Sequence, residues 1–331
     1  MYNSFDNPGL VRVLSFLKSH NTEYLSGQDL SDVLKISRVA VWKHIKKIKE
    51  LGYKIDSKQK LGYRLTENTK LLLPWEITAG LNTKFIGKKV YYYDSIDSTQ
   101  TQAIKLAEEK KENGSVIIAQ KQTGGRGRLG RKWVSPKGGI WISVILHPEF
   151  NITATMLFPV AASLALALAI EQCTKIKPKL KWPNDLTING KKIAGTLVDI
   201  SLESNKTENL VLGVGINFDV NISQIKKALE KSPKFYGAES IKKYDNNVQP
   251  IMLIQTFLQE LEKICEKLTD AQYDEITKEW TKRSSTIGNE IKISDGSEDI
   301  RGKAIRIDQD GALVITNKSK TRRIMVGDVS R

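Results

Sequence analysis

The feature that most constrains the fold is a glycine- and arginine-rich stretch between two apolar segments. Residues 124–133 read GGRGRLGRKW, and they separate the predicted strands 115–120 and 140–146. Glycine lets backbone N–H groups approach a ligand closely, and arginine grips phosphate or carboxylate through two donors. Loops held between buried strands commonly carry binding residues. We call residues 124–133 the glycine loop and expect it to close around an anion.

Two other interpretations of the glycine loop compete with this one. A solvated Gly/Arg linker would seldom interrupt such apolar strands. Residues 125–130 also match the dinucleotide-binding pattern G-x-G-x-x-G, but that motif must open a helix. Pro136, Gly138 and Gly139 exclude a helix directly after the loop. The interpretation as an anion-binding loop is therefore favoured, and the motifs in the rest of the chain test it.

Length and charge limit the possible classes of protein. A chain of 331 residues suggests two or three domains, and its net charge of +15 (52 basic minus 37 acidic residues) favours a polyanion, a nucleotide or an acidic protein as partner. Cys173 and Cys265 lie far apart and predict buried free thiols in a reducing cytosol. The apolar run 156–170 has about 15 residues, fewer than the ~20 that span a bilayer, so we expect a core helix. The prediction is a cytoplasmic protein without a membrane partner.

Residues 1–68 have the pattern of a small DNA-binding domain. Apolar residues at helical spacing predict three helices. Ser26 and Ser37 are the predicted N-caps of the second and third, and the third helix ends near Leu51. A short hairpin with a basic tip follows, and this order resembles a winged helix-turn-helix. Residues 35–64 hold ten basic and two acidic side chains, a local net charge of +8 (10 − 2). The residues predicted to contact DNA are Ser37, Arg38, Val39, Trp42, Lys43, Lys46, Lys58 and Lys60. A basic domain used for protein contacts stays the alternative.

Residues 69–282 place further polar groups at the ends of predicted strands and helices. Ser98 and Thr99 lie at the start of a predicted helix. Their hydroxyls either only cap the helix, or cap it and also contact a small polar ligand. Asn189-Gly190 is a strong hairpin signal, and Lys192 lies on the return strand; taken alone, this lysine would be a solvated one. Gly213 and Gly215 interrupt an apolar strand, which indicates either close approach of a ligand or backbone, or a bulge.

Five ordered motifs carry a resemblance to a known family. They are DSTQ at 97–100, QTGGRGRLGRKW at 122–133, KWPNDL at 181–186, KIAG at 192–195 and GIN at 215–217. They resemble the motifs of the biotin protein ligase family. With a winged helix ahead of them, the chain is similar throughout its length to the bifunctional biotin ligases that also repress the biotin operon. Gln100 departs from the pattern, because the family often has asparagine there, which puts its ligand contact in doubt.

The resemblance implies a two-step reaction. Biotin and ATP, assisted by Mg²⁺, give biotinyl-5′-AMP and pyrophosphate, and a lysine of a biotin carboxyl carrier domain then takes the biotinyl group. The resemblance assigns catalytic roles to Lys192, Arg126, Arg128 and Asp185. It assigns biotin binding to Ser98, Thr99, Gln100, Gln122, Gly124, Arg126, Gly127, Arg128, Trp133, Lys192 and Gly195. It assigns ATP binding to Arg126, Arg128, Asn184, Lys192 and Asn217, and no residue is assigned to the metal.

The predicted fold class is α+β with three domains. Residues 1–68 form the winged helix-turn-helix, residues 69–282 a mixed-sheet ligase domain like that of class II synthetases, and residues 283–331 an SH3-like β-barrel. In the last domain, strands 290–294, 301–307 and 312–316 are separated by turns at Asp295-Gly296 and Asp310-Gly311.

Three functions stay open at this point. The first is a biotin ligase that also binds operator DNA, as a homodimer when its ligand is bound. The second is a DNA-binding biotin sensor without ligase activity, against which the presence of Lys192, Arg126 and Arg128 argues. The third is a lipoate-type ligase, which shares the fold and chemistry, although the tandem arginine loop and KWPND resemble the biotin branch.

Overall fold

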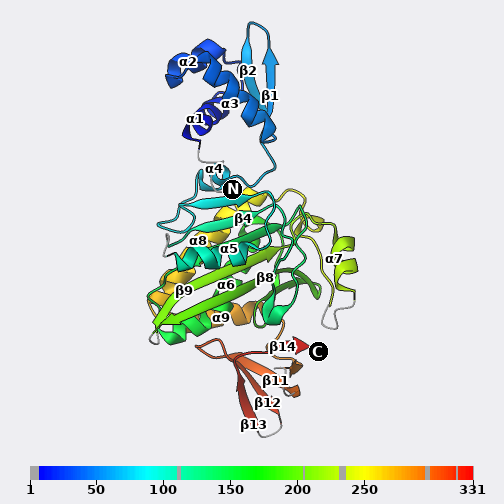
Figure 1. The fold of residues 1–331 in the computed structure, drawn as a ribbon. Coiled ribbons are helices and arrows are strands. Elements are labelled where there is room, and N and C mark those ends of the chain that lie inside the picture. The colour runs from blue at the N-terminus through cyan, green and yellow to red at the C-terminus, as the bar shows by residue number, and fades with distance from the viewer. Residues whose placement is uncertain are drawn as a thin grey trace. The chain divides into compact units, whose positions relative to one another are not determined.

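The chain forms two compact units, Met1–Trp75 and Glu76–Arg331, each described here by itself (Figure 1). The computed structural model describes residues 7–109, 113–203, 206–230, 236–294, 299–317 and 320–330. The division between the units falls close to the predicted end of the DNA-binding domain. The predicted boundary at residues 68 and 69 and the one at residues 282 and 283, which lies inside the second unit, both stay predictions.

The first unit is a three-helix domain with a two-stranded hairpin. Its elements are α1 (Pro8–Ser19), α2 (Gly27–Leu34), α3 (Arg38–Glu50), β1 (Lys54–Lys58) and β2 (Gly62–Glu67). The predicted caps are present, because Ser26 and Asp29 form a reciprocal capping box and the Ser37 hydroxyl accepts from the Ala40 N–H. Leu30 and Leu34 of α2 are buried, whereas Val33 on the same helix is exposed.

The second unit is built on a seven-stranded mixed sheet, as predicted. Its strand order is β3-β4-β5-β9-β8-β7-β6, and only the β3–β4 pair is parallel. The strands are β3 (Val90–Tyr93), β4 (Val116–Ala119), β5 (Ile140–Leu146), β6 (Lys179–Lys181), β7 (Asp185–Ile188), β8 (Lys191–Glu203) and β9 (Lys206–Ile216).

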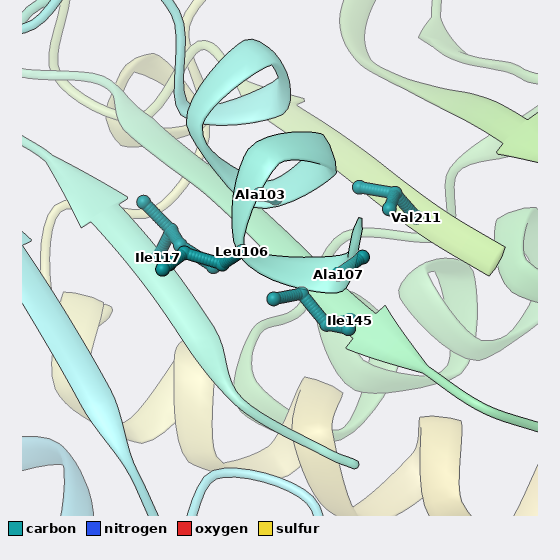
Figure 2. Close-up of a cluster of buried hydrophobic side chains, with 6 residues drawn as sticks. All are labelled: Ala103, Leu106, Ala107, Ile117, Ile145 and Val211. Carbon is teal, nitrogen blue, oxygen red and sulfur yellow. The ribbon is translucent and has the colours of Figure 1, made fainter. Parts of the chain in front are cut away.

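Helix α5 (Thr99–Glu108) covers one face of this sheet. Figure 2 shows the contact, in which the helix meets β4, β5 and β9 through Ala103, Leu106, Ala107, Ile117, Ile145 and Val211. Each is buried, and burying a leucine or isoleucine side chain contributes roughly 1.5–3 kcal/mol. Side chains two apart on a strand share a face, so Gly213 and Gly215 of β9 lie on the same face as Val211. The helix therefore lies on the same face of the sheet as those two glycines.

The other face is covered by the long apolar helix α6 (Ile152–Cys173), with α8 (Pro250–Thr269) and α9 (Tyr273–Arg283) packed against it (Figure 1). At 22 residues α6 is long and apolar enough to cross a membrane, so the length argument from the sequence is wrong. Burial supports the predicted core helix instead, because 72% of its most apolar window is buried inside the protein. Cys173 at its end is only half-buried, whereas Cys265 is buried, and both thiols are free.

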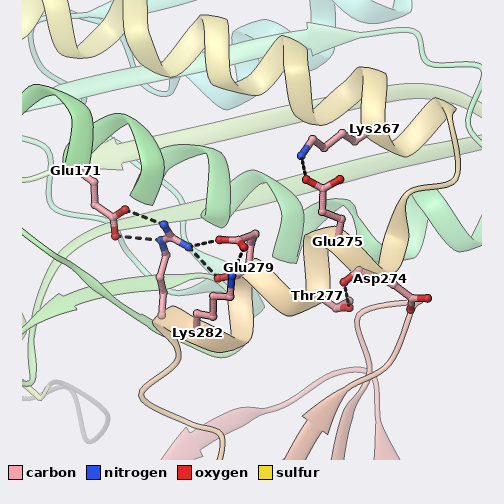
Figure 3. A network of polar contacts seen from close by, with 8 residues as sticks. Glu171, Lys267, Asp274, Glu275, Thr277, Glu279 and Lys282 are labelled. Carbon is pink, nitrogen blue, oxygen red and sulfur yellow. Dashed lines mark hydrogen bonds and ion pairs between the residues drawn. The ribbon is translucent and has the colours of Figure 1, made fainter.

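An ion cluster ties the end of α9 to α6. The Arg283 guanidinium donates to both carboxylate oxygens of Glu171, at 3.0 and 2.9 Å, and to Glu279 at 2.9 Å. Figure 3 shows Glu171 facing the helix that carries Glu279. The bond to Glu171 is the main cause of a raised pKa for Arg283. A bidentate pair of this kind fixes the position from which the chain leaves α9 for the C-terminal strands.

The C-terminal strands form a five-stranded antiparallel sheet in the order β13-β12-β11-β10-β14. They are β10 (Glu290–Ser294), β11 (Asp299–Ile307), β12 (Leu313–Asn317), β13 (Lys320–Ile324) and β14 (Asp328–Ser330). The three predicted strands are present, and β13 and β14 were not anticipated. The predicted turn at residues 295 and 296 lies outside the described residues. Closure of the sheet into an SH3-like barrel stays a prediction.

The remaining elements are α4 (Pro74–Thr78), α7 (Ile222–Leu229) and two short 3₁₀ turns, η1 (Arg128–Gly130) and η2 (Ile241–Lys243). The turn η1 lies inside the glycine loop, where the residues after it form no helix, as Pro136 and its neighbouring glycines predicted.

Candidate functional site

A cavity of about 1300 Å³ gathers the predicted site in the second unit. Of the residues predicted to bind biotin or ATP, all except Gly124 line it. Gly124 instead donates its N–H to the Asp97 carbonyl at 2.7 Å and lies outside the cavity lining. A space of this size exceeds what a drug-sized ligand needs, so it can hold two small molecules side by side.

The glycine loop folds as a compact hairpin over the cavity. The Gly127 N–H donates to the Arg131 carbonyl at 2.7 Å, and the Trp133 N–H donates to the Gly125 carbonyl at 2.9 Å. A Cβ on Gly125 would lie 2.4 Å from the Trp133 carbonyl oxygen, so a side chain there is incompatible with the hairpin. The glycine is required for the loop to fold on itself, a reason that the sequence pattern did not reveal.

A buried hydrogen-bond network forms the polar end of the cavity. The Thr99 N–H and hydroxyl both donate to the Gln122 side-chain oxygen, at 2.7 and 3.1 Å, while the Gln122 amide donates to the Ser135 hydroxyl at 2.8 Å. The Ser143 hydroxyl donates to the Thr99 hydroxyl at 2.9 Å. The Ser98 hydroxyl accepts from the Thr101 N–H and caps α5 as predicted, and Ser98 also lines the cavity. Such a network holds donors and acceptors in fixed directions.

Gln100 belongs to the wall of the cavity. Its amide donates to Asp199 at 3.0 Å and to the Val211 carbonyl at 2.9 Å, and its oxygen lies 2.9 Å from the Ser143 hydroxyl, whose single proton it shares with the Thr99 hydroxyl. Gly213 leaves the space for it, because a Cβ there would lie 2.5 Å from the Gln100 oxygen. The hydrogen bonds of Gln100 therefore connect α5, β5, β8 and β9 beneath the site.

Trp133 forms the apolar side of the cavity, and Gly215 makes room for it. A Cβ on Gly215 would lie 2.5 Å from the indole ring. Trp133 also meets Trp141 edge-on, with ring centroids 6.5 Å apart. Both strand glycines of β9 thus admit side chains of the protein itself, and β8–β9 pairing continues without a bulge at either glycine.

Lys192 reaches the cavity because of a bulge between β7 and β8. Asp185 pairs with Gly195 and Thr187 pairs with Lys192, with a register shift between these pairs. Directly paired residues share a face, so the one-residue bulge puts Lys192 on the same face as Gly195, three positions away. There the Lys192 ammonium lies 2.5 Å from the Asp185 carboxylate and 4.7 Å from the centre of the Trp133 ring. A cation is thus held between a carboxylate and an aromatic face.

Arg128 and Arg131 of the glycine loop contact the chain at the start of β14. Arg128 donates to the Gly327 carbonyl at 3.2 Å and to the Asn184 oxygen at 3.4 Å, and Arg131 donates to Asp328 at 2.6 Å. Burial lowers the pKa of Arg128, and the nearby Asp328 charge offsets part of that effect; guanidinium remains protonated throughout the ordinary pH range. The C-terminal sheet therefore contributes directly to the loop's position.

Arg126 and Asn217, two of the predicted site residues, contact other residues of the cavity wall. Arg126 extends toward Asp199, with 3.7 Å between the guanidinium nitrogen and the carboxylate oxygen, and remains exposed. Asn217 donates its side-chain amide to the Lys192 carbonyl at 3.2 Å and is buried. The same cavity is lined by residues that the sequence pattern did not single out for the site, among them Arg131, Lys181, Tyr236, Lys292, Asp299 and Asp328.

The first unit carries a separate exposed basic surface. All eight residues predicted to contact DNA are exposed. The Lys46 ammonium lies 5.8 Å from the centre of the Trp42 ring on α3, and the Lys58 ammonium lies 5.0 Å from the centre of the Tyr24 ring. Within the described residues, Lys43, Lys46 and Lys60 form no ion pair with a carboxylate. Their charges are therefore available to an anionic partner.

Comparison with known proteins identifies the class to which this fold and cavity belong. Residues 92–217 match the Biotin/lipoate A/B protein ligase family, residues 11–64 match the HTH domain, and residues 286–331 match the Biotin protein ligase C terminal domain. The chain is 32% identical over 318 residues to the bifunctional ligase/repressor BirA of Bacillus spizizenii, covering 96% of this chain and 97% of that one. The chain therefore belongs to the family of bifunctional biotin ligases and repressors.

Two further proteins resemble the ligase part. The biotin–[acetyl-CoA-carboxylase] ligase of Paracoccus denitrificans is 28% identical over 237 residues, covering 70% of this chain and 96% of that one. The structure of the Aquifex aeolicus biotin protein ligase in complex with biotin and ATP matches with a TM-score of 0.61 and 28% identity, covering 73% of this chain and 98% of that chain.

Proposed function

We propose that the second unit catalyses ATP-dependent activation of biotin. A carboxylate oxygen of biotin bonds to the α-phosphorus of ATP, and the bond to the β-phosphate breaks to release pyrophosphate. The observation that carries this proposal is the anchored Lys192 ammonium, 2.5 Å from Asp185 in a cavity lined also by Arg126 and Arg128. Fixed cations aimed at developing negative charge are a major source of rate enhancement for such a step.

Two groups of residues that line the cavity suit the two parts of the adenylate. The bonded network around Thr99 and Gln122 offers oriented polar groups to the ureido ring of biotin, and such sites reject analogues that leave those groups unpaired. Trp133 offers an apolar face to the valeryl chain. Asn184 and Asn217, which we assign to the nucleotide, also line the cavity.

The second step transfers the biotinyl group to a lysine amine of a carrier domain. The amine bonds to the acyl carbon, AMP leaves, and the amine loses a proton. No covalent link to this chain is required. The name of the Paracoccus relative supports a carrier domain of acetyl-CoA carboxylase as acceptor. A cytoplasmic location suits a reaction that consumes ATP and modifies such an enzyme.

The described residues suit Mg²⁺ that is bound mainly by the phosphates of ATP. No group of three or more His, Cys, Asp or Glu side chains gathers into a metal site among them. Mg²⁺ usually retains several waters and takes one or two carboxylates together with phosphate oxygens. When bound, the ion would neutralise phosphate charge, while Lys192 and the arginines act on the reacting oxygens.

The first unit would bind operator DNA through α3 and the hairpin tip. A single domain of this kind makes few base contacts, so we propose a ligand-dependent homodimer that places two α3 helices on two half-sites. The supporting observation is the exposed, unpaired set of cations that includes Lys43 and Lys46. Operator binding should tighten when biotin and ATP are added; equal affinity with and without them would leave an independent DNA-binding domain.

One experiment separates the three candidate functions. The protein is incubated with ATP and either biotin or lipoate, and the acyl-adenylate and pyrophosphate are measured by mass spectrometry and a coupled assay. Biotinyl-adenylate with biotin alone supports the biotin ligase. Formation of the acyl-adenylate with lipoate but not with biotin would mean that the protein is a lipoate-type ligase. If neither acid reacts while biotin still binds, the protein is a sensor rather than an enzyme.

A further inference from the structure

The ion pair between Asp185 and Lys192 in the cavity is joined by a third residue, Tyr236. The Tyr236 hydroxyl donates to one carboxylate oxygen of Asp185 at 2.6 Å, and the Lys192 ammonium lies 2.5 Å from the other oxygen. Asp185 thus lies between a phenol, from which one oxygen accepts a hydrogen bond, and an ammonium, which is within ion-pair distance of the other oxygen. None of the five sequence motifs contains Tyr236.

Lys192 needs such support because its side chain is long. A lysine has a flexible four-carbon stem with rotatable donors, so its charge is not placed by the backbone alone. Gly195 provides the space for the pair, since a Cβ there would lie 3.0 Å from the Lys192 side chain and 3.1 Å from the Asp185 oxygen. The position of the ammonium therefore depends on where the Asp185 carboxylate is held.

The segment that carries Tyr236 is fastened to the backbone of Lys192 itself. The Lys192 N–H donates to the Gly237 carbonyl at 3.1 Å, and the Glu239 N–H donates to the Lys192 carbonyl at 2.9 Å. The Lys181 ammonium lies 3.7 Å from the centre of the Tyr236 ring. The phenol is thereby kept in register with the lysine that it supports.

The protonation of Tyr236 suits a donor. Desolvation of the hydroxyl and the negative charge of Asp185 both raise the pKa of Tyr236 above its ordinary value. The phenol therefore keeps its proton at neutral pH, so its hydroxyl can only stabilise the carboxylate by donating to it.

We propose that Tyr236 is a positioning residue for the activation step, which orients Lys192 by fixing the Asp185 carboxylate. This inference rests on the proposed biotin activation. A merely structural Tyr236 would act on stability or on ligand affinity. A positioning Tyr236 acts on the rate of adenylate formation at saturating substrates, because a misplaced charge stabilises the transition state less than a fixed one.

The test is Tyr236→Phe, which removes the hydroxyl and keeps the ring. We expect kcat for pyrophosphate release to fall about tenfold, since a hydrogen bond to a charged group is lost, with KM for biotin and the melting temperature nearly unchanged. Tyr244→Phe is the matched control, because Tyr244 is 37% exposed, Tyr236 is 38% exposed, and Tyr244 does not line the cavity. The control should keep the parent rate.

A double-mutant cycle tests whether Tyr236 affects the rate of adenylate formation through Asp185. If Tyr236 acts through Asp185, then Tyr236→Phe should change the rate little in an Asp185→Asn background, because the carboxylate that it fixes is already gone. Full additivity of the two changes, or an unaltered kcat in Tyr236→Phe alone, would overturn the proposal. A parent protein that activates neither biotin nor lipoate would instead reject the proposed function on which it rests.

Discussion

Each unit of this protein holds a lysine over a tryptophan ring, and the two pairs differ in what surrounds them. On α3, the Lys46 ammonium lies 5.8 Å from the Trp42 ring centre, and Trp42 is 54% exposed. In the cavity, the Lys192 ammonium lies 4.7 Å from the Trp133 ring centre and also contacts Asp185. Because water and salt screen exposed charges, the first pair suits sequence-tolerant phosphate binding. The second suits catalysis, where position matters more than charge alone.

The most direct way to test the comparison is to remove the enclosed lysine. Lys192→Ala should reduce adenylate formation by about 10²–10³-fold, the range for loss of one positioned stabilising group, and should weaken biotin binding much less. Pyrophosphate release and titration calorimetry measure the two effects. Lys191→Ala is the neighbouring control, because Lys191 pairs with Glu239 rather than with Asp185. Near-parent adenylate synthesis in Lys192→Ala would remove the lysine from the mechanism.

A second change disturbs the tryptophan rather than the lysine. Gly215→Ala places a Cβ 2.5 Å from the Trp133 indole, so the ring must move or the strand must shift. We expect a loss of about 1–3 kcal/mol in the free energy of unfolding, as for other overpacked sites, together with weaker biotin binding. Urea denaturation and calorimetry are the measurements.

Gly124→Ala is the contrast within the same site. Its added Cβ would lie 3.4 Å from the Asp97 carbonyl oxygen, which is ordinary contact, and Gly124 does not line the cavity. Biotin affinity close to that of the parent would remove Gly124 from the predicted ligand contacts. A loss as large as that of Gly215→Ala would restore it.

A third change loosens the glycine loop from the C-terminal sheet. Asp328→Asn weakens the 2.6 Å bond to Arg131, so amides in residues 121–139 should exchange faster in the unliganded protein, with biotin and ATP restoring protection. Adenylate formation should fall only a few-fold, as expected for one charge-assisted bond between partly exposed groups. Asp310→Asn, whose partner Arg323 lies on β13, is the control. Identical exchange in parent and variant would mean that the loop is held without Asp328.

The sequence predicted the parts of the site that depend on local chemistry. Asn189 and Gly190 adopt the positive φ angles of a tight hairpin, as that dipeptide predicts. The bulge that turns Lys192 into the cavity was not predictable, because it is a property of strand pairing and neither β7 nor β8 marks it with a distinctive residue. The contacts of Tyr236 with Asp185 and of Arg131 with Asp328 join segments far apart in the chain, and only the folded structure brings them together.

The smallest expected effect belongs to the exposed lysine. If the Lys46 ammonium contacts a DNA phosphate, Lys46→Ala should weaken binding to all sequences alike and lower the slope of log K against log salt by about one unit. Lys47→Ala, whose ammonium pairs with Glu50 on the same helix, should lower the slope less. Adenylate formation, measured across the same salt series, should be unchanged in both variants and should depend weakly on salt, because the Lys192 side chain is only 25% exposed. An equally steep salt dependence for catalysis and DNA binding would mean that the two lysine–tryptophan pairs are screened alike, and the contrast between them would be lost.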